Sequence, residues 1–90
     1  MEIEFDPAKR AKTLEVRGLD MERAAEVFEG VTWTVEDARN DYGESRWMTA
    51  GMLDGRMVML LWTPRGDARR IISLRKANAR EQATYSPRLR

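Results

Sequence analysis

The dipeptide Asp54-Gly55 constrains the fold of this chain more than any other feature. It is flanked by two segments rich in apolar residues, 46–53 and 56–63. Asp-Gly is a preferred pair for a type I′ turn, which joins two antiparallel strands through two residues. Within the second segment, residues 57–62 are all apolar, as expected of a strand that is covered on both faces. The sequence therefore predicts a β-hairpin whose second strand lies at the centre of a sheet.

Two helices are predicted before this hairpin. Asp6, followed by proline, marks the start of a helix that includes residues 9–17, and Gly18 marks its end. Asp20 begins a second helix, which Gly30 ends. This second helix carries an apolar stripe at helical spacing, formed by Met21, Ala24, Ala25 and Phe28. Such a stripe predicts packing against the core.

Three further strands are predicted over residues 3–5, 31–35 and 69–74, the first of them at an edge of the sheet. The polar segment 36–45 is predicted to be a loop. Residues 86–90 are expected to form a frayed basic tail.

Asn78 and Glu81 have the spacing of a capping box, which predicts a short helix that ends near Tyr85. The element order β-α-α-β-β-β-α then predicts an α+β fold with a mainly antiparallel sheet. Two N-terminal helices and the short C-terminal helix are expected to pack on one face of that sheet. At 90 residues, the chain is expected to form a single domain over residues 1–90.

The charge of the chain is unevenly distributed. Residues 65–90 contain eight basic and two acidic side chains, whereas residues 1–44 contain twelve acidic and six basic ones. Arginine predominates among the bases, and its planar guanidinium binds phosphate through two parallel hydrogen bonds. This pattern indicates either a nucleic-acid-binding segment or a solvated charged surface.

The composition excludes several classes of site. The chain has no cysteine and no histidine, so it has no disulfide, no thiolate nucleophile, no Ser–His–Asp triad and no zinc site of the usual kind. The N-terminal sequence is acidic, unlike a secretory signal, and the longest apolar run, residues 57–62, is far shorter than the roughly 20 residues that span a bilayer. A cytoplasmic protein without membrane contact is expected.

Strand periodicity allows the basic side chains to be assigned to faces. In the strand 69–74, regular alternation places Arg70 with Ile72 and Leu74, and Arg69 on the other face with Ile71, Ser73 and Arg75. Regular pairing about Asp54-Gly55 places Arg46 opposite Thr63, so that Arg46, Trp47 and Arg65 gather near one end of the sheet. Arginines beside an aromatic ring suit single-stranded RNA, whose phosphates and unpaired bases they bind. Alternatively, Trp47 belongs to the core and the arginines extend over it.

The ordered motifs resemble the BrnT-type toxins over about residues 3–85. The resemblance rests on the sequences FDPAK (5–9), GLDMERAAEVF (18–28), RWMTAG (46–51) and RIISLRKA (70–77), followed by Arg80-Glu81 and Tyr85. It differs from the usual family pattern at Thr13 and at Val16-Arg17-Gly18, where relatives carry Asn and Lys-His-Gly. Trp47 stands where tyrosine or phenylalanine is common.

The resemblance implies a RelE-like fold and the toxin of a type II toxin–antitoxin pair. Such toxins cleave mRNA, in some cases at the ribosome, and thereby inhibit translation. Their partner is a ribbon-helix-helix antitoxin of the BrnA type, through which the complex binds operator DNA.

RNA can be cleaved through its own 2′-hydroxyl, so neither a metal nor another cofactor is expected. We expect Arg46, Arg70 and Arg75 to bind the scissile phosphate and Tyr85 to assist catalysis. The other residues expected to bind RNA are Lys9, Trp47, Arg65, Arg69, Lys76 and Arg80. Without histidine, the remaining proton-transfer candidates are Glu81, Lys9 and Lys76, and the capping role of Glu81 competes with a catalytic one. The alternatives are a non-catalytic module that binds nucleic acid or protein through the same basic surface, and a structural domain that only binds an acidic antitoxin.

Overall fold

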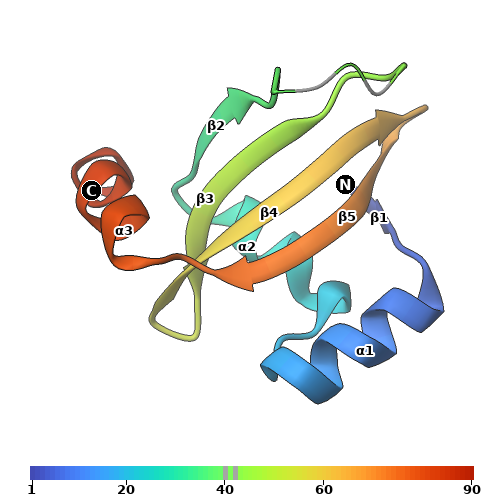
Figure 1. Cartoon of the computed structure of the whole chain (residues 1–90), viewed down its shortest axis with the longest axis horizontal. Coiled ribbons are helices and arrows are strands. Elements are labelled where there is room, and N and C mark those ends of the chain that lie inside the picture. The colour runs from blue at the N-terminus through green and yellow to red at the C-terminus, as the bar shows by residue number, and fades with distance from the viewer. Residues whose placement is uncertain (40, 42) are drawn as a thin grey trace.

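A β-sheet forms the centre of the fold in the computed structural model, which describes residues 1–39, 41 and 43–90. Asn40 and Tyr42, in the segment predicted to be a loop, lie outside the described residues. Within this described part, five strands are present: β1 (Glu2–Glu4), β2 (Trp33–Glu36), β3 (Trp47–Leu53), β4 (Arg56–Arg65) and β5 (Ala68–Lys76). Their order in the sheet is β1-β5-β4-β3-β2, with β1 parallel to β5 and the other neighbours antiparallel (Figure 1). The α+β class and the mainly antiparallel sheet are therefore confirmed.

The predicted hairpin is formed by β3 and β4. Asp54 and Gly55 both have positive φ angles, 52° and 75°, as the two central positions of a type I′ turn require. Leu53 pairs with Arg56 across the turn. The second strand, β4, pairs with β3 on one side and β5 on the other, so it occupies the central position that its continuous apolar run predicted.

Three of the helical segments in the described part of the chain begin at the predicted caps Asp6, Asp20 and Asn78. The helical segments are α1 (Pro7–Arg17), the 3₁₀ turn η1 (Met21–Arg23), α2 (Ala24–Glu29), α3 (Ala79–Tyr85) and the 3₁₀ turn η2 (Ser86–Leu89). The Asp6 carboxylate accepts a hydrogen bond from the Ala8 amide, and Asp20 accepts one from Glu22. The single helix predicted from Asp20 is thus divided into η1 and α2. The prediction of a frayed tail is wrong, because η2 is ordered by the packing of Leu89 against the sheet.

The two faces of the sheet carry different helices. On the first face, η1 and α2 contribute Met21 and Val27 to the main core, which includes Leu60 and Leu74 of the sheet. On the second face, Tyr85 of α3 and the η2 residue Leu89 pack on a smaller cluster, whose buried members are Ala50, Met57, Met59 and Ala77. Figure 1 shows α1 and α3 at separate places around the sheet. The prediction that all helices share one face is therefore wrong for α3, because β4 exposes an apolar surface on each side of the sheet.

A register shift in β5 changes which arginines share a face. Leu61 pairs with Ser73 but the next residue, Trp62, pairs with Ile71, so Ile72 is an extra residue in β5. Alternation is interrupted there, and Arg70 lies on the same face as Arg75, not on the opposite one. The prediction that Arg70 and Arg75 lie on different faces is therefore wrong, because the sequence pattern does not reveal this bulge.

Candidate functional site

A row of three residues crosses the second face of the sheet near the end of β4. Thr63 pairs with Arg70 of β5, and the pair Trp47–Trp62 places Arg46 next in register on the other side of Thr63. The Thr63 hydroxyl donates a hydrogen bond of 2.7 Å to the Ser45 carbonyl, which fixes the start of β3 against β4. Neighbouring strands lie 4.7–4.9 Å apart, so the backbones of Arg46 and Arg70 are about 10 Å apart.

Arg75 lies further along the same face. It pairs with Met59, four residues before Thr63 in β4, which corresponds to about 13 Å along the strand. We call the surface formed by Arg46, Thr63, Arg70 and Arg75 the basic face.

Arg75 also borders a cavity of about 250 Å³ between the sheet and α3. Its guanidinium donates two hydrogen bonds to the Glu81 carboxylate, Nη1 to Oε1 at 2.7 Å and Nη2 to Oε2 at 2.8 Å. Tyr85 lines the same cavity, and Met48 and Met59 provide an apolar surface beside it. Three residues singled out from the sequence, Arg75, Glu81 and Tyr85, are thus brought together.

Glu81 has three partners in this arrangement. Its side chain accepts hydrogen bonds from Arg75 and from the Asn78 amide, and the Asn78 side chain accepts one from the Glu81 amide, which completes the predicted capping box. The hydrogen bond from Arg75 holds the pKa of Glu81 below its ordinary value. Glu81 is therefore ionised at neutral pH and is a poor proton donor.

Each arginine of the basic face has an acidic neighbour. Arg70 lies 3.8 Å from Glu4 of β1, and Arg46 lies 3.1 Å from Glu44. These carboxylates hold the guanidinium groups over the sheet, while the side chains remain partly exposed. The three cations of the basic face are thus each oriented by a carboxylate, with which an incoming anion has to compete.

Sequence reasoning missed two residues beside this cavity, Asp37 and Arg39. The Arg39 guanidinium donates hydrogen bonds of 2.7 and 2.9 Å to the two oxygens of the nearly buried Asp37 carboxylate, and these lower the pKa of Asp37. Both residues line the cavity together with Arg75. In the sequence, both residues follow closely after the strand predicted over residues 31–35, and this position was the signal that could have indicated them.

Trp47 and Arg69 lie on the opposite face of the sheet. The Trp47 ring stacks on Trp62, with centroids 6.5 Å apart. The Arg69 guanidinium lies over the rings of Phe28 and Trp62, at 4.4 and 4.5 Å from their centroids. These contacts account for both side chains as part of the packing around the main core, and the structure does not bring them to the basic face.

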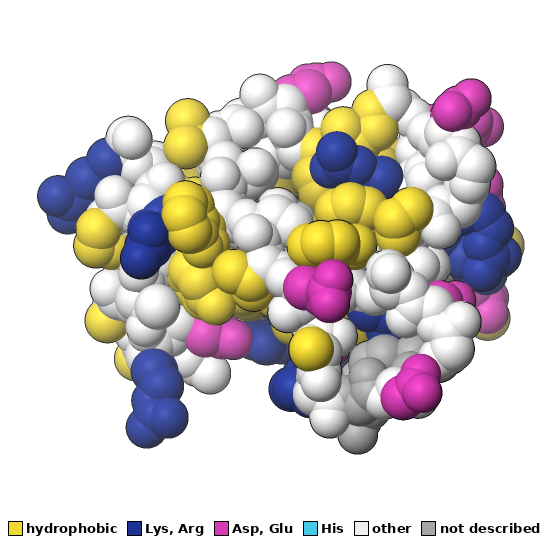
Figure 2. All heavy atoms as spheres, turned by 90° about the horizontal axis from the view of Figure 1, so that it is seen from above, with side chains coloured by type: hydrophobic (Ala, Val, Ile, Leu, Met, Phe, Trp, Pro, Cys, Tyr) yellow, Lys and Arg dark blue, Asp and Glu magenta, His cyan; other side chains and the backbone are white. Residues whose placement is uncertain are grey.

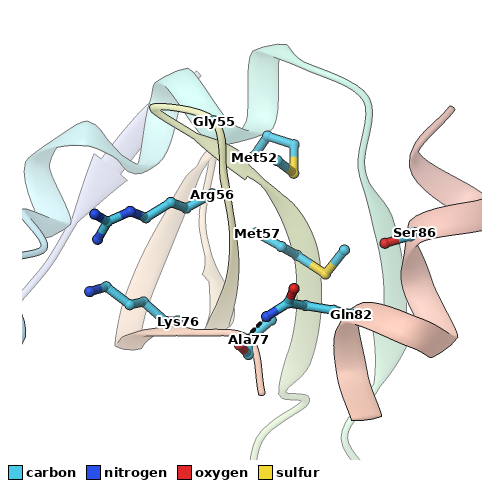
Figure 3. A pocket seen from close by; sticks show the side chains of 8 residues that line it. All are labelled: Met52, Gly55, Arg56, Met57, Lys76, Ala77, Gln82 and Ser86. Atoms are coloured by element: carbon cyan, nitrogen blue, oxygen red, sulfur yellow. Dashed lines mark hydrogen bonds between the residues drawn. The ribbon is translucent and has the colours of Figure 1, made fainter. Parts of the chain in front are cut away.

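The other predicted RNA-binding residues are dispersed. Arg65 is exposed at the end of β4, Arg80 is exposed on α3 and Lys9 is exposed on α1. Lys76 borders a cavity of about 300 Å³ near the Asp54-Gly55 turn. In Figure 3 the side chains of Lys76 and Arg56 extend to the same side, whereas Met57 points towards α3 and the α3 residue Gln82 extends back to donate a hydrogen bond to the Ala77 carbonyl.

On the face seen in Figure 2, basic side chains lie directly beside hydrophobic ones, and acidic side chains lie mostly nearer the periphery. The described residues contain no group of three or more carboxylates close enough together to bind a metal ion. No helix among them has the length and apolar character needed to cross a membrane.

Comparison with known proteins gives a match over most of the chain. The family model described as "Ribonuclease toxin, BrnT, of type II toxin-antitoxin system" matches residues 5–81. The matched region extends from the start of α1 to Glu81 and includes all three arginines of the basic face. No curated protein matches the chain.

Proposed function

This chain belongs to the BrnT family of ribonuclease toxins of type II toxin–antitoxin systems, and we propose that it cleaves RNA on the basic face. The observation that supports the proposal is that Arg46, Arg70 and Arg75 share one face of the sheet, where Arg75 also borders the cavity lined by Tyr85. Guanidinium groups stay protonated and bind phosphate oxygens. Together they therefore stabilise the extra negative charge that develops when the phosphorus becomes pentacoordinate in the transition state.

The proposed reaction needs only the RNA and these side chains. The 2′-oxygen forms a bond to the adjacent phosphorus while the bond from phosphorus to O5′ breaks, which leaves a 2′,3′-cyclic phosphate and a 5′-hydroxyl. The proton of the 2′-hydroxyl passes to solvent, and the Tyr85 phenol donates a proton to O5′ and recovers one from solvent. No metal ion takes part.

Glu81 has a positioning role in this scheme. Its carboxylate holds Arg75 in place through two hydrogen bonds, and its low pKa keeps that ion pair formed at neutral pH. A carboxylate so occupied, and also bound to the Asn78 amide, is poorly suited to moving protons.

The biological setting that follows is growth inhibition by mRNA cleavage in the cytoplasm, with or without a ribosome. We assign the fold to the RelE-like toxins, with residues 1–90 as one domain. The partner in this proposal is a ribbon-helix-helix antitoxin of the BrnA type, and operator DNA is bound only through the complex of the two. The family membership supports an antitoxin partner and an RNA substrate.

A second candidate function is a non-catalytic module that binds nucleic acid or protein. The ion pairing of every arginine on the basic face favours it, because a paired guanidinium binds phosphate less strongly. RNA cleavage by the wild-type chain separates the two candidates, and the variants R46Q, R70Q and R75Q, with thermal unfolding measured alongside, test the assignment of the site. If the protein is a nuclease, each variant loses cleavage while it remains folded; full cleavage by all three would refute the assignment of the site.

A further inference from the structure

A separate pocket of about 310 Å³ lies where α1 covers the outer edge of β5. Lys9, Lys12, Thr13 and Val16 stand at positions i, i+3, i+4 and i+7, so they share one face of α1, and this face lines the pocket. Ile72 and Ser73, at the bulge of β5, line it from the sheet. The remaining lining residues are Arg17 and Met21.

The pocket carries positive charge that no acidic side chain offsets. Its titratable lining residues are Lys9, Lys12 and Arg17, without a carboxylate among them. Neither lysine forms an ion pair within the described part of the chain, and Arg17 donates its hydrogen bond of 2.8 Å to the neutral carbonyl of Leu74. The arginines of the basic face, by contrast, are each paired with a carboxylate.

The placement of Lys9 is unfavourable for the helix itself. It lies in the first turn of α1, where the helix dipole repels a cation. That turn itself contains no acidic residue, and the carboxylate of the preceding cap, Asp6, accepts a hydrogen bond from the Ala8 amide. Lys12 lies one turn further along the same face, so the two positive charges reinforce each other. An anionic ligand relieves this repulsion when it binds between them.

Ser73 connects this pocket with the basic face. It lines the pocket from the bulge, and its pairing with Leu61 places it on the face that carries Arg70 and Arg75. β1 pairs with β5 only at residues 68–70, so the β5 edge next to Ser73 is not covered by another strand. An RNA strand can therefore pass from the basic face over this edge into the pocket.

We propose that this pocket binds a nucleotide of the RNA substrate that flanks the cleaved phosphate, an inference that rests on the proposed function. Lys9, Lys12 and Arg17 bind its phosphates. The apolar side chains of Val16 and Ile72 contact its base, and the hydroxyls of Thr13 and Ser73 offer hydrogen bonds to it. The pocket volume lies at the lower end of the range for small-molecule sites, which suits a single nucleotide.

The test is RNA binding by the double variant K9Q/K12Q. The probe is a short fluorescein-labelled 2′-O-methyl oligoribonucleotide, which lacks the attacking hydroxyl and is not cleaved. We expect about tenfold weaker binding at low salt, with the slope of log K against log salt reduced by about 0.7 for each phosphate that the variant no longer neutralises. Glutamine preserves helix propensity, and a thermal melt of each variant checks folding.

The matched control is R56Q/R90Q, which removes the same charge at exposed positions outside the pocket. If K9Q/K12Q binds the probe no more weakly than this control, the inference is wrong. A direct measurement supports the comparison: the bound probe should protect Lys9 and Lys12 of the wild-type chain from acetylation. Unprotected lysines in the presence of saturating probe would also overturn the inference.

The two proposals fail in distinguishable ways. If R70Q and R75Q abolish cleavage while K9Q/K12Q binds and cleaves as the control does, the pocket assignment fails and the nuclease assignment stands. If K9Q/K12Q keeps RNA binding but loses binding to the protein encoded by the adjacent reading frame, the pocket is a protein-docking site and the inference is wrong. If the wild-type chain neither binds nor cleaves RNA, both proposals fail.

Discussion

Arg75 and Glu81 are joined by two hydrogen bonds of 2.7 and 2.8 Å, and this ion pair links the last sheet strand to the C-terminal helix. The link fixes α3 so that Tyr85, one turn after Glu81, lines the same cavity as Arg75. Glu81 thereby holds next to each other the two residues to which we assign phosphate binding and proton donation, Arg75 and Tyr85.

The first prediction concerns the Tyr85 hydroxyl. Y85F removes a proton donor but keeps the aromatic ring, which packs on the smaller apolar cluster that includes Ala50 and Met59 on the second face of the sheet. We expect the rate of RNA cleavage to fall by about 100-fold or more, with RNA affinity and melting temperature unchanged. Single-turnover kinetics on a labelled RNA measures this. An unchanged cleavage rate would exclude Tyr85 as the proton donor.

The second prediction concerns the Glu4–Arg70 pair. Glu4 lies 3.8 Å from the Arg70 guanidinium and competes with phosphate for it. E4Q should bind RNA about two- to fivefold more tightly, because an exposed ion pair of this kind contributes up to about 1 kcal/mol. Fluorescence anisotropy at several salt concentrations measures the gain. The matched control is E15Q, an exposed position on α1 where the same charge change should have a smaller effect.

The third prediction is a pH dependence of stability. Two hydrogen bonds from Arg10 and one from the Glu22 amide lower the pKa of Asp20 to about 2. A carboxylate whose pKa is lower in the folded state stabilises the fold above its unfolded pKa of about 3.9, and this stabilisation is lost as the pH falls through 2.

The variant D20N tests this, because asparagine caps a helix as well as aspartate does but is uncharged and can accept only one of the two hydrogen bonds from Arg10. At pH 7 we expect D20N to be less stable by about 1 kcal/mol, since solvent screens part of the interaction. The difference should shrink between pH 4 and pH 2. Chemical denaturation across this range measures it, and a difference that does not depend on pH would contradict the account.

The fourth prediction concerns the contact between β3 and α2. A methyl group added at Gly51 would lie 2.5 Å from Val27 Cγ1 and 3.1 Å from Thr32 Cγ2. G51A should therefore destabilise the fold by about 1–3 kcal/mol through overpacking. The same substitution in a V27A background should be less harmful, and a double-mutant cycle by urea denaturation measures the coupling. Equal effects of G51A in both backgrounds would show that the clash is relieved elsewhere.

The sequence predicted the local structure well because each element carries its own short-range determinants. The Asp54-Gly55 turn, the Asp6 and Asp20 caps and the Asn78–Glu81 capping box depend on residues at most three positions apart. These determinants are sufficient to define the hairpin and to fix where the helices begin.

The arrangement of the site could not be predicted, because it depends on long-range features. The bulge at Ile72 changes the face of Arg70 relative to Arg75, and it arises from the pairing of β5 with β4 and not from a residue type. β4 presents an apolar surface on each face of the sheet, and α3 packs on the second one. The local sequence of α3 does not indicate which of the two faces it covers. Arg39 was missed because its partner Asp37 is buried only in the folded chain.

We have proposed that this chain cleaves RNA through the 2′-hydroxyl at the basic face. The most direct test is to incubate purified protein with an excess of RNA in the presence of a chelator and to identify the new ends by mass spectrometry. We expect many cleavages per protein molecule, each leaving a 2′,3′-cyclic phosphate and a 5′-hydroxyl, and no cleavage by R70Q. RNA that is bound but intact, or cleavage by R70Q at the wild-type rate, would contradict it.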